Sequence, residues 1–196
     1  MFASMNFEIK GLDAILASLA RLKAGKYSFK LLVAGKGNIR KYTQVAREVN
    51  IADNVVFTGR LSKEKLIRLY LASDMYVMLS KFDTFGMVVL EAMAAGLPVI
   101  ISSNVGAKDI VQEGENGFII SDTSDAEYIA SKISLLFDEN IRSAMARKAL
   151  DTSLQNTWAQ VTAKYGDIYS DILATRENNL SPIPHIKPAK CFSNLS

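Results

Sequence analysis

Residues 75–101 read MYVMLSKFDTFGMVVLEAMAAGLPVII, and this segment indicates the fold class most directly. It begins with an apolar run at 75–79 and ends with another at 97–101. Both runs have the length and continuous apolar character of strands that are buried on both faces. The residues between them, 85–95, are expected to form a helix. A strand, a helix and a second strand in this order predict a βαβ unit, whose strands are parallel.

The same alternation continues on both sides of this segment. Leucine and isoleucine recur at helical spacing over residues 10–24, and Ser62 is a good N-cap for a helix that carries Leu66, Leu69 and Tyr70 on one face. Further strands are predicted at 29–34, 55–58 and 118–120, and further helices at 39–49, 124–137, 140–153 and 157–173. The sequence therefore predicts an α/β fold, a parallel sheet with helices on both faces.

The composition excludes several classes of protein. Of the 196 residues, 49% are hydrophobic and 22% are charged, so most of the chain can form a packed core. The net charge of +3 is too small and too scattered for a nucleic-acid groove. The single cysteine, Cys191, rules out a disulfide framework and a cysteine-based zinc site. The single histidine, His185, lies in a proline-rich stretch, so a Ser/His/Asp triad is not expected.

The chain is predicted to contain one domain, residues 1–175, followed by a flexible or extended tail at 176–196. The tail is rich in Glu, Asn, Ser, Pro and Lys and has few apolar residues to pack. No apolar run approaches the roughly 18 residues of a membrane span, and the start lacks the pattern of a signal peptide. We therefore expect a cytoplasmic protein. Because residue 1 is followed almost at once by the end of a strand, the sequence is also interpreted as a possible fragment.

Candidate binding residues follow the strand at 75–79. Ligands of open α/β sheets bind beyond the carboxyl ends of the strands, where loops enter helices. If the helix begins near Phe85, the N–H groups of Phe85, Gly86, Met87 and Val88 are unpaired donors that can hold an anion. Asp83 lies in the loop, and Glu91 lies one to two turns into the helix. Two acids that flank an anion-binding helix start suit a nucleotide sugar, with hydroxyl groups at each acid and the diphosphate between them.

A simpler interpretation remains open at this point. Asp83 can be a helix cap and Glu91 a solvated helix residue, since acids are common near helix starts. Against it, Glu91 lies within the apolar run VVLEAMAAGLPVI, where an unpaired carboxylate would be costly to bury. A ligand that contacts Glu91 would remove this cost.

Several segments together carry a family resemblance: DTFGMVVLE (83–91), the run that continues to Ile100, Gly106, Asp109–Val111 and GENGFII (114–120). They resemble the donor-binding half of a family 4 retaining glycosyltransferase. This family has two acids separated by seven residues, usually both Glu; here the first is Asp83, whose side chain is one methylene shorter. The resemblance implies a Rossmann-like sheet that forms one half of a GT-B fold. Within the family, the chain looks closest to lipopolysaccharide core glucosyltransferases.

Other parts of the chain also resemble the family. Lys10-Gly11 is similar to an element whose lysine contacts the donor diphosphate, although the arginine that usually precedes it is absent from ASMNFEI (3–9). The segment FKLLVAGKGN (29–38) resembles the family's strand with a Gly-x-Gly loop, which makes Gly35 a candidate binding residue, and Arg40 or Lys41 after this loop could supply the missing positive charge. The segment NVVFTGRLS (54–62) is similar to the family's nucleobase loop, in which backbone groups near residues 57–60, including Arg60, would hold the base.

The resemblance implies a role for each acid and for the lysine. Glu91 would bind the ribose, Asp83 the donor hexose, and Lys10 the diphosphate together with the amides of residues 85–88. The implied donor is a UDP-sugar similar to UDP-glucose, and no metal or other cofactor is required. The acceptor, a glycan or a lipid-linked molecule, would bind mainly to an N-terminal domain that these 196 residues do not contain.

The expected consequence is a chain that binds donor but transfers sugar poorly or not at all. The resemblance also implies a position at the inner face of the cell membrane, and an exposed last helix could support a homodimer. One alternative is a non-catalytic nucleotide-sugar-binding or scaffolding module. Another, a dinucleotide binder, is disfavoured because Gly35-Lys36-Gly37 is followed by Arg40 where a GxGxxG motif has glycine.

Overall fold

The computed structural model describes residues 1–179, and every strand pair in this part of the chain is parallel. One three-stranded sheet has the order β1-β2-β3, and a second has the order β4-β5-β6. The strand bounds are β1 Phe2–Ser4, β2 Leu31–Gly35, β3 Val55–Gly59, β4 Tyr76–Met78, β5 Val99–Ser102 and β6 Gly117–Ile120. The predicted strands agree with these within two residues at each end, because each is a short apolar run.

Residue Met1 connects the two sheets. Its amino group donates a hydrogen bond to the carbonyl oxygen of Met75 at 2.7 Å, and its own carbonyl accepts one from the N–H of Val77 at 2.9 Å. β1 and β4 therefore lie side by side, and the combined order is β3-β2-β1-β4-β5-β6. The first strand, β1, lies in the middle of the sheet; β2 and β3 extend the sheet to one edge, and β4, β5 and β6 extend it to the other. This order is that of a doubly wound, Rossmann-like sheet, with a topological switch point between β1 and β4.

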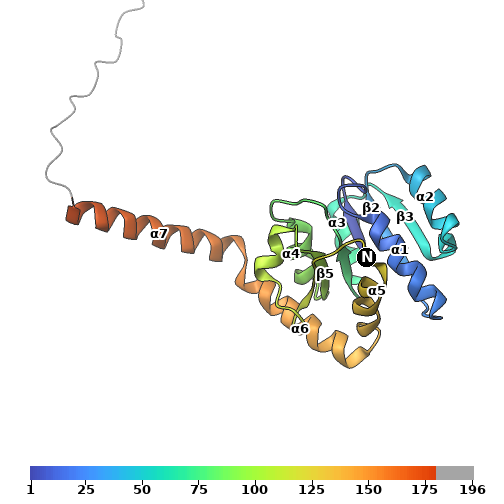
Figure 1. Ribbon diagram of the computed structural model, residues 1–196. Coiled ribbons are helices and arrows are strands. Elements are labelled where there is room, and N and C mark those ends of the chain that lie inside the picture. The colour runs from blue at the N-terminus through green and yellow to red at the C-terminus, as the bar shows by residue number, and fades with distance from the viewer. Residues whose placement is uncertain (180–196) are drawn as a thin grey trace, which may run out of the picture. The chain divides into compact units, whose positions relative to one another are not determined.

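Helices connect the strands (Figure 1). Their bounds are α1 Leu12–Ala24, α2 Ile39–Glu48, α3 Lys63–Leu71, α4 Met87–Ala94, α5 Ala126–Leu135 and α6 Glu139–Gln155, with short 3₁₀ turns η1 Ala52–Asn54 and η2 Gly106–Ile110. α1 packs against α2 and α5, whereas α4 packs against α6. No helix within residues 1–179 combines the length and the apolar character that a bilayer crossing requires.

The core divides into two clusters, one on each face of the sheet. In β4, Val77 belongs to the cluster formed with α1, α2 and α5, whereas Tyr76 and Met78 belong to the cluster formed with α3, α4 and α6. In β5, Ile100 belongs to the first cluster, and Val99 and Ile101 to the second. Alternate residues of one strand thus point to opposite, equally apolar layers. The predicted α/β fold with helices on both faces is confirmed.

The chain divides at Thr157 into two units, of which residues 1–156 form the first. Within the second, α7 Trp158–Asn179 carries a stripe of apolar residues at helical spacing: Tyr165, Ile168, Tyr169, Ile172 and Leu173. α7 runs four residues into the predicted tail, because no proline occurs before Pro182 to end it. The rest of the tail, with His185 and Cys191, lies outside the described residues. The predicted domain boundary at residue 175 stays a prediction.

Candidate active site

The loops that follow β1 and β4, residues 5–11 and 79–86, meet at the switch point. The carbonyl oxygen of Ile9 accepts a hydrogen bond from the N–H of Lys81 at 2.8 Å, and Ser80 Oγ lies 3.2 Å from the same oxygen. Gly11 has a φ of +77°, and a Cβ there would collide with the carbonyl oxygen of Leu79. The two loops can approach this closely only because residue 11 is glycine. Open α/β sheets bind their ligands at this position.

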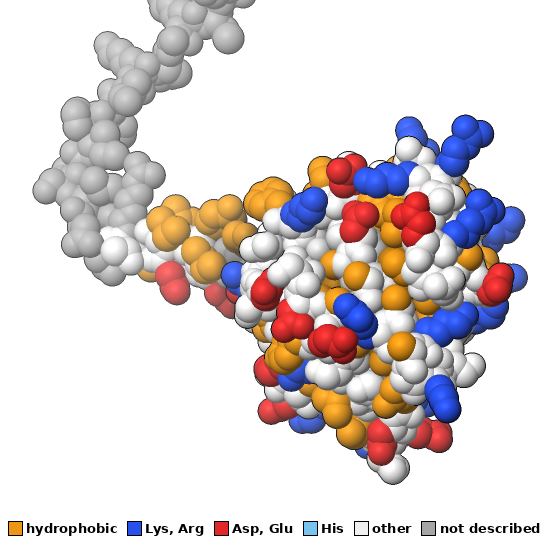
Figure 2. Space-filling view, turned by 45° about the vertical axis from the view of Figure 1, so that its right-hand side comes forward, with side chains coloured by type: hydrophobic (Ala, Val, Ile, Leu, Met, Phe, Trp, Pro, Cys, Tyr) orange, Lys and Arg blue, Asp and Glu red, His pale blue; other side chains and the backbone are white. Residues whose placement is uncertain are grey.

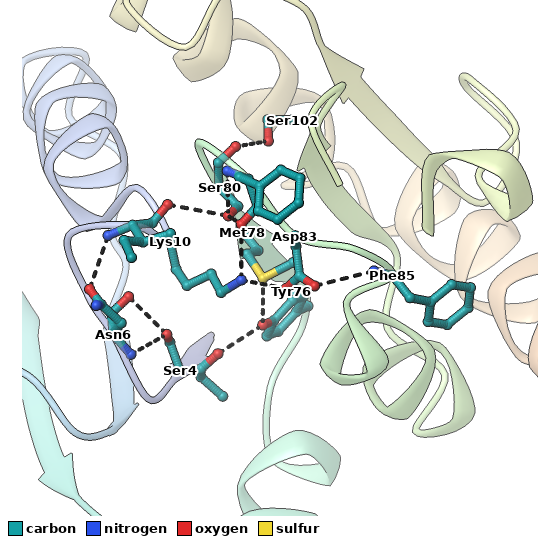
Figure 3. A network of polar contacts seen from close by, with 12 residues as sticks. Ser4, Asn6, Lys10, Tyr76, Met78, Ser80, Asp83, Phe85 and Ser102 are labelled. Atoms are coloured by element: carbon teal, nitrogen blue, oxygen red, sulfur yellow. Dashed lines mark hydrogen bonds and ion pairs between the residues drawn. The ribbon is translucent and has the colours of Figure 1, made fainter. Parts of the chain in front are cut away.

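Lys10 and Asp83 form an ion pair between these two loops (Figure 3). Lys10 Nζ lies 2.5 Å from Asp83 Oδ2 and also donates a hydrogen bond to the carbonyl oxygen of Phe82 at 3.2 Å. The side chains are only 21% and 18% exposed. Lys10 was expected to face the diphosphate and Asp83 the hexose, and the structure brings them into direct contact. A partly buried cation and a partly buried carboxylate therefore form the centre of the candidate site.

Asp83 does not cap α4, so the simpler interpretation of this residue is wrong. Its Oδ1 accepts a hydrogen bond from the N–H of Phe85 at 3.3 Å, which is a local turn within the loop. α4 begins at Met87, two residues later than predicted, and Gly86 occupies the N-cap position without a side-chain cap. The backbone of Asp83 also pairs with the loop after β5, because its N–H donates to Asn104 and its carbonyl accepts from Gly106. Asp83 is therefore fixed on both sides.

The start of α4 offers backbone donors, as predicted, but the set differs by one residue. The N–H of Phe85 is already bonded to Asp83, so it is not a free donor. Within the described chain, the N–H groups of Gly86, Met87 and Val88 have no hydrogen-bond acceptor. Gly86 has a φ of +87°, which a residue with a Cβ rarely adopts. The turn at Gly86 thus begins the helix beside Asp83 and leaves these donors at its N-terminus.

Glu91 is exposed, so the argument that a ligand is needed to offset its burial fails, and the simpler interpretation, a solvated helix residue, agrees with the structure for Glu91. The buried side of α4 is formed by Val89, Ala92 and Met93, and Glu91 lies off this stripe. Its Oε2 accepts a hydrogen bond from the hydroxyl of Tyr70 in α3 at 3.3 Å. Glu91 is therefore a solvent-facing carboxylate with one oxygen anchored to the protein.

A buried tyrosine lies within electrostatic range of both carboxylates. Burial, and then the charges of Tyr70, Glu91 and Asp83, raise the pKa of Tyr76 well above its ordinary value. Its hydroxyl donates a hydrogen bond to the carbonyl oxygen of Ala3 at 3.1 Å, so it also connects β4 to β1 (Figure 3).

The other predicted residues lie along the same edge of the sheet and do not contact the ion pair. Gly35 ends β2, and Arg60 follows β3 and is exposed. Arg40 and Lys41 lie in the first turn of α2 and are also exposed, and Lys41 Nζ lies 3.7 Å from a Glu8 carboxylate oxygen. Their contribution to binding stays a prediction.

A cleft of about 390 Å³ opens beside the loop that carries Lys10. It lies between residues 5–8, after β1, and residues 36–42, after β2. A cavity of similar size, about 340 Å³, lies at the opposite edge of the sheet and contains none of the predicted residues. The first cleft includes Lys41 but is not lined by Lys10, Asp83 or Glu91. We assign the candidate site to the carboxyl edge because the ion pair and the free amides of α4 lie there.

The sequence analysis missed the serines that hold the loop after β4. Ser80 Oγ donates to the carbonyl oxygen of Phe82 at 2.8 Å, and Ser102 Oγ donates to the carbonyl oxygen of Ser80 at 2.5 Å. Both serines are buried. A polar residue directly after an apolar strand is the signal that could have identified them. Tyr70 was also missed, because its place in an apolar stripe is that of an ordinary core residue.

No group of three or more His, Cys, Asp or Glu side chains in residues 1–179 is arranged to hold a metal ion. Figure 2 shows cationic and anionic side chains interspersed over the visible face of the molecule. The polar groups of the candidate site within the described residues are the charged side chains of Lys10 and Asp83 and the backbone N–H groups at the start of α4.

Residues 2–152 match the family model described as "Glycosyl transferases group 1". Among curated proteins, the N-acetyl-alpha-D-glucosaminyl L-malate synthase of Bacillus anthracis is 28% identical over 174 residues, which are 87% of this chain and 45% of that protein. The matched region contains Lys10, Asp83 and Glu91.

Solved structures with the same fold include a sucrose-phosphate synthase from Thermosynechococcus elongatus, with a TM-score of 0.76 and 25% identity over 89% of this chain and 45% of that one. WaaG, a glycosyltransferase involved in lipopolysaccharide biosynthesis, superimposes with a TM-score of 0.74 and 24% identity over 85% of this chain and 45% of that one. The chain thus spans less than half the length of these similar proteins.

Proposed function

The chain belongs to the glycosyl transferases group 1 family, and from this premise we propose that it is the donor-binding domain of a retaining hexosyltransferase. The donor is a nucleoside diphosphate sugar, and the acceptor is a glycan or a lipid-linked molecule. A domain of this kind binds the donor at one end of its sheet, and the acceptor binds to a second domain. The family match favours this function over a non-catalytic binding module.

The observation that carries the proposal is the Lys10–Asp83 pair beside the start of α4. A nucleoside diphosphate sugar presents two anionic phosphates next to a ring of hydroxyl groups. Lys10 and the N–H groups of Gly86, Met87 and Val88 can bind the phosphates. Asp83 accepts hydrogen bonds and is suited to the hexose hydroxyls. The cation and the carboxylate lie side by side, so they are near enough to bind the phosphates and the hexose of one donor.

Glu91 completes the proposed donor site. It is exposed on α4 and its carboxylate can accept hydrogen bonds from the two ribose hydroxyls. We assign a uracil base and a glucose-like hexose to the donor. A lipopolysaccharide-type acceptor at the inner face of the membrane is part of the same proposal.

The transfer itself needs stabilisation of the departing nucleoside diphosphate. As the bond between the anomeric carbon and the phosphate oxygen breaks, negative charge increases on the diphosphate. Lys10 and the amides at the start of α4 lie where they can stabilise this charge without a metal ion. The acceptor hydroxyl forms the new bond to the anomeric carbon and gives its proton to the departing diphosphate oxygen. In this proposal Asp83 binds the sugar and is assigned no covalent role.

The test is a calorimetric titration of the purified chain with UDP, UDP-glucose, GDP-mannose and ADP-glucose, first without metal and then with magnesium. We expect one base to bind without metal and UDP-glucose to be among the ligands that bind. Glu91→Ala is expected to weaken that binding several-fold, because a hydrogen bond to a charged group contributes roughly 1.5–3 kcal/mol. Absence of binding to all four nucleotides would overturn the assignment of a donor site.

A further inference from the structure

Tyr70 connects the buried core to the exposed Glu91 carboxylate. The tyrosine is 2% exposed and belongs to the core cluster on the α3, α4 and α6 face of the sheet. Its ring packs against that of Tyr76, with the centroids 6.0 Å apart. Its hydroxyl lies 3.3 Å from Glu91 Oε2 and 3.5 Å from the carbonyl oxygen of Val88. A rigid side chain from α3 therefore ends at the residue to which we assign the ribose.

The phenolic hydroxyl has one proton, so it can donate to only one of these two acceptors at a time. The carboxylate is both nearer and charged, and hydrogen bonds to charged acceptors are the stronger ones. Burial, followed by the neighbouring charge of Glu91, raises the pKa of Tyr70 above its ordinary value. Tyr70 therefore stays protonated at neutral pH and donates its hydrogen bond to Glu91.

An exposed glutamate without such a contact samples many rotamers. Fixing a glutamate side chain costs conformational entropy, and a ligand that must order Glu91 loses binding free energy as a result. A hydrogen bond from a buried tyrosine reduces the cost by ordering the carboxylate before the ligand arrives. Oε1 and the second lone pair of Oε2 remain available as acceptors.

We propose that Tyr70 is a positioning residue, which orients the Glu91 carboxylate for the two hydroxyl groups of the donor ribose. This inference rests on the proposed function, because it requires Glu91 to contact a ribose. It adds a residue in α3, outside the DTFGMVVLE segment, to the determinants of donor binding. Tyr70 itself does not touch the donor.

The chain offers a matched control in Tyr76. It is also a buried tyrosine of the same cluster, but its hydroxyl bonds to the carbonyl oxygen of Ala3. Tyr76→Phe and Tyr70→Phe each remove one buried hydroxyl and keep the ring. Only Tyr70→Phe removes a hydrogen bond to Glu91, so the two variants separate a positioning effect from a general loss of stability.

The experiment measures the affinities of the full chain for UDP and for 2′,3′-dideoxy-UDP, which lacks both ribose hydroxyls. We expect Tyr70→Phe to weaken UDP binding about three- to tenfold, the effect of one lost hydrogen bond, and to leave the dideoxy analogue unchanged. Tyr76→Phe is expected to change neither affinity. In a Glu91→Ala background, Tyr70→Phe should add little further loss, because the carboxylate that Tyr70 orients is absent.

Each contrary result has its own meaning. If Tyr70→Phe weakens both ligands equally, or neither, Tyr70 is structural and this inference is wrong, while the donor site stands. If Glu91→Ala leaves UDP binding unchanged, the ribose role of Glu91 is wrong and so is the inference. If the chain binds none of UDP, ADP and GDP, the proposed function itself is overturned.

Discussion

Lys10 Nζ and Asp83 Oδ2 are 2.5 Å apart, although the two residues are separated by 73 positions in the chain. Lys10 belongs to the loop between β1 and α1, and Asp83 to the loop between β4 and α4. The pair therefore forms only when β1 and β4 lie side by side. Without a ligand, each charge neutralises the other. A diphosphate that binds Lys10 has to share this cation with Asp83 or draw it away.

Removing the charge of Asp83 is expected to separate sugar binding from nucleotide binding. Asp83→Asn keeps an acceptor for the N–H of Phe85 but releases Lys10 from its ion pair. UDP should bind at least as tightly as to the wild type, whereas UDP-glucose should bind several-fold more weakly because the hexose loses a charged acceptor. Calorimetric titration of both ligands measures the difference. An equal loss for UDP and UDP-glucose would contradict the sugar role of Asp83.

Removing the charge of Lys10 is expected to weaken both ligands together. Lys10→Met keeps most of the length of the side chain but loses the charge-assisted contact with the diphosphate, so UDP and UDP-glucose should each bind about tenfold or more weakly. The exposed Lys81 in the adjoining loop provides the control. Lys81→Met should reduce either affinity less than twofold, because exposed charges are screened by salt. Equal effects of the two lysine variants would mean that binding responds only to net charge.

The sequence predicted the fold well because its main signals are local. The runs 75–79 and 97–101 are apolar at consecutive positions, and the structure buries β4 and β5 on both faces. The start of α4 was misjudged by two residues. Gly86 adopts a positive φ and Asp83 bonds to the N–H of Phe85, and neither feature has a periodic signature in the sequence.

The candidate site was less predictable because its contacts are long-range. Lys10 and Asp83 were each assigned to a donor on the basis of a family resemblance, but their direct contact depends on the pairing of β1 with β4. The exposure of Glu91 depends on which side of α4 faces the sheet, and the surrounding run is too uniformly apolar to reveal this. Tyr70 was expected in the core and does lie there, but its hydroxyl could be assigned only from the structure.

The close approach of the two site loops makes a prediction about Gly11. Alanine at this position would adopt an unfavourable φ and would also place its Cβ against the carbonyl oxygen of Leu79. Gly96 has a similar φ of +75°, but open space surrounds the position of its Cβ. Gly96→Ala should therefore lower the free energy of unfolding by about 1–2 kcal/mol through backbone strain alone.

Gly11→Ala should cost about 1–3 kcal/mol more than Gly96→Ala, because the backbone has to move to relieve the clash. Denaturation in urea measures both variants against the wild type. Since the displaced loop carries Lys10, Gly11→Ala should also weaken UDP binding, whereas Gly96→Ala should not. Equal stabilities of the two variants would show that the loops can separate without cost.

The buried tyrosines predict how stability changes at alkaline pH. Burial is the main cause that raises the pKa values of Tyr70 and Tyr76 above the ordinary value of 10. Above pH 10 the unfolded chain loses these two protons while the folded chain keeps them, so the folded state binds more protons. The contribution of these two protonated hydroxyls to the free energy of unfolding is complete below pH 10. It falls as pH rises further, by at most about 1.4 kcal/mol per pH unit for each tyrosine.

Replacement of either tyrosine should therefore flatten this decline. Tyr76→Phe should be less stable than the wild type at pH 8, because it loses the hydrogen bond to the carbonyl oxygen of Ala3. Between pH 10 and 11 its free energy of unfolding should fall less steeply than that of the wild type, and Tyr70→Phe should behave in the same way. Urea denaturation at pH 8, 9, 10 and 11 gives these slopes, and identical alkaline slopes in all three proteins would mean that neither hydroxyl stays protonated through burial.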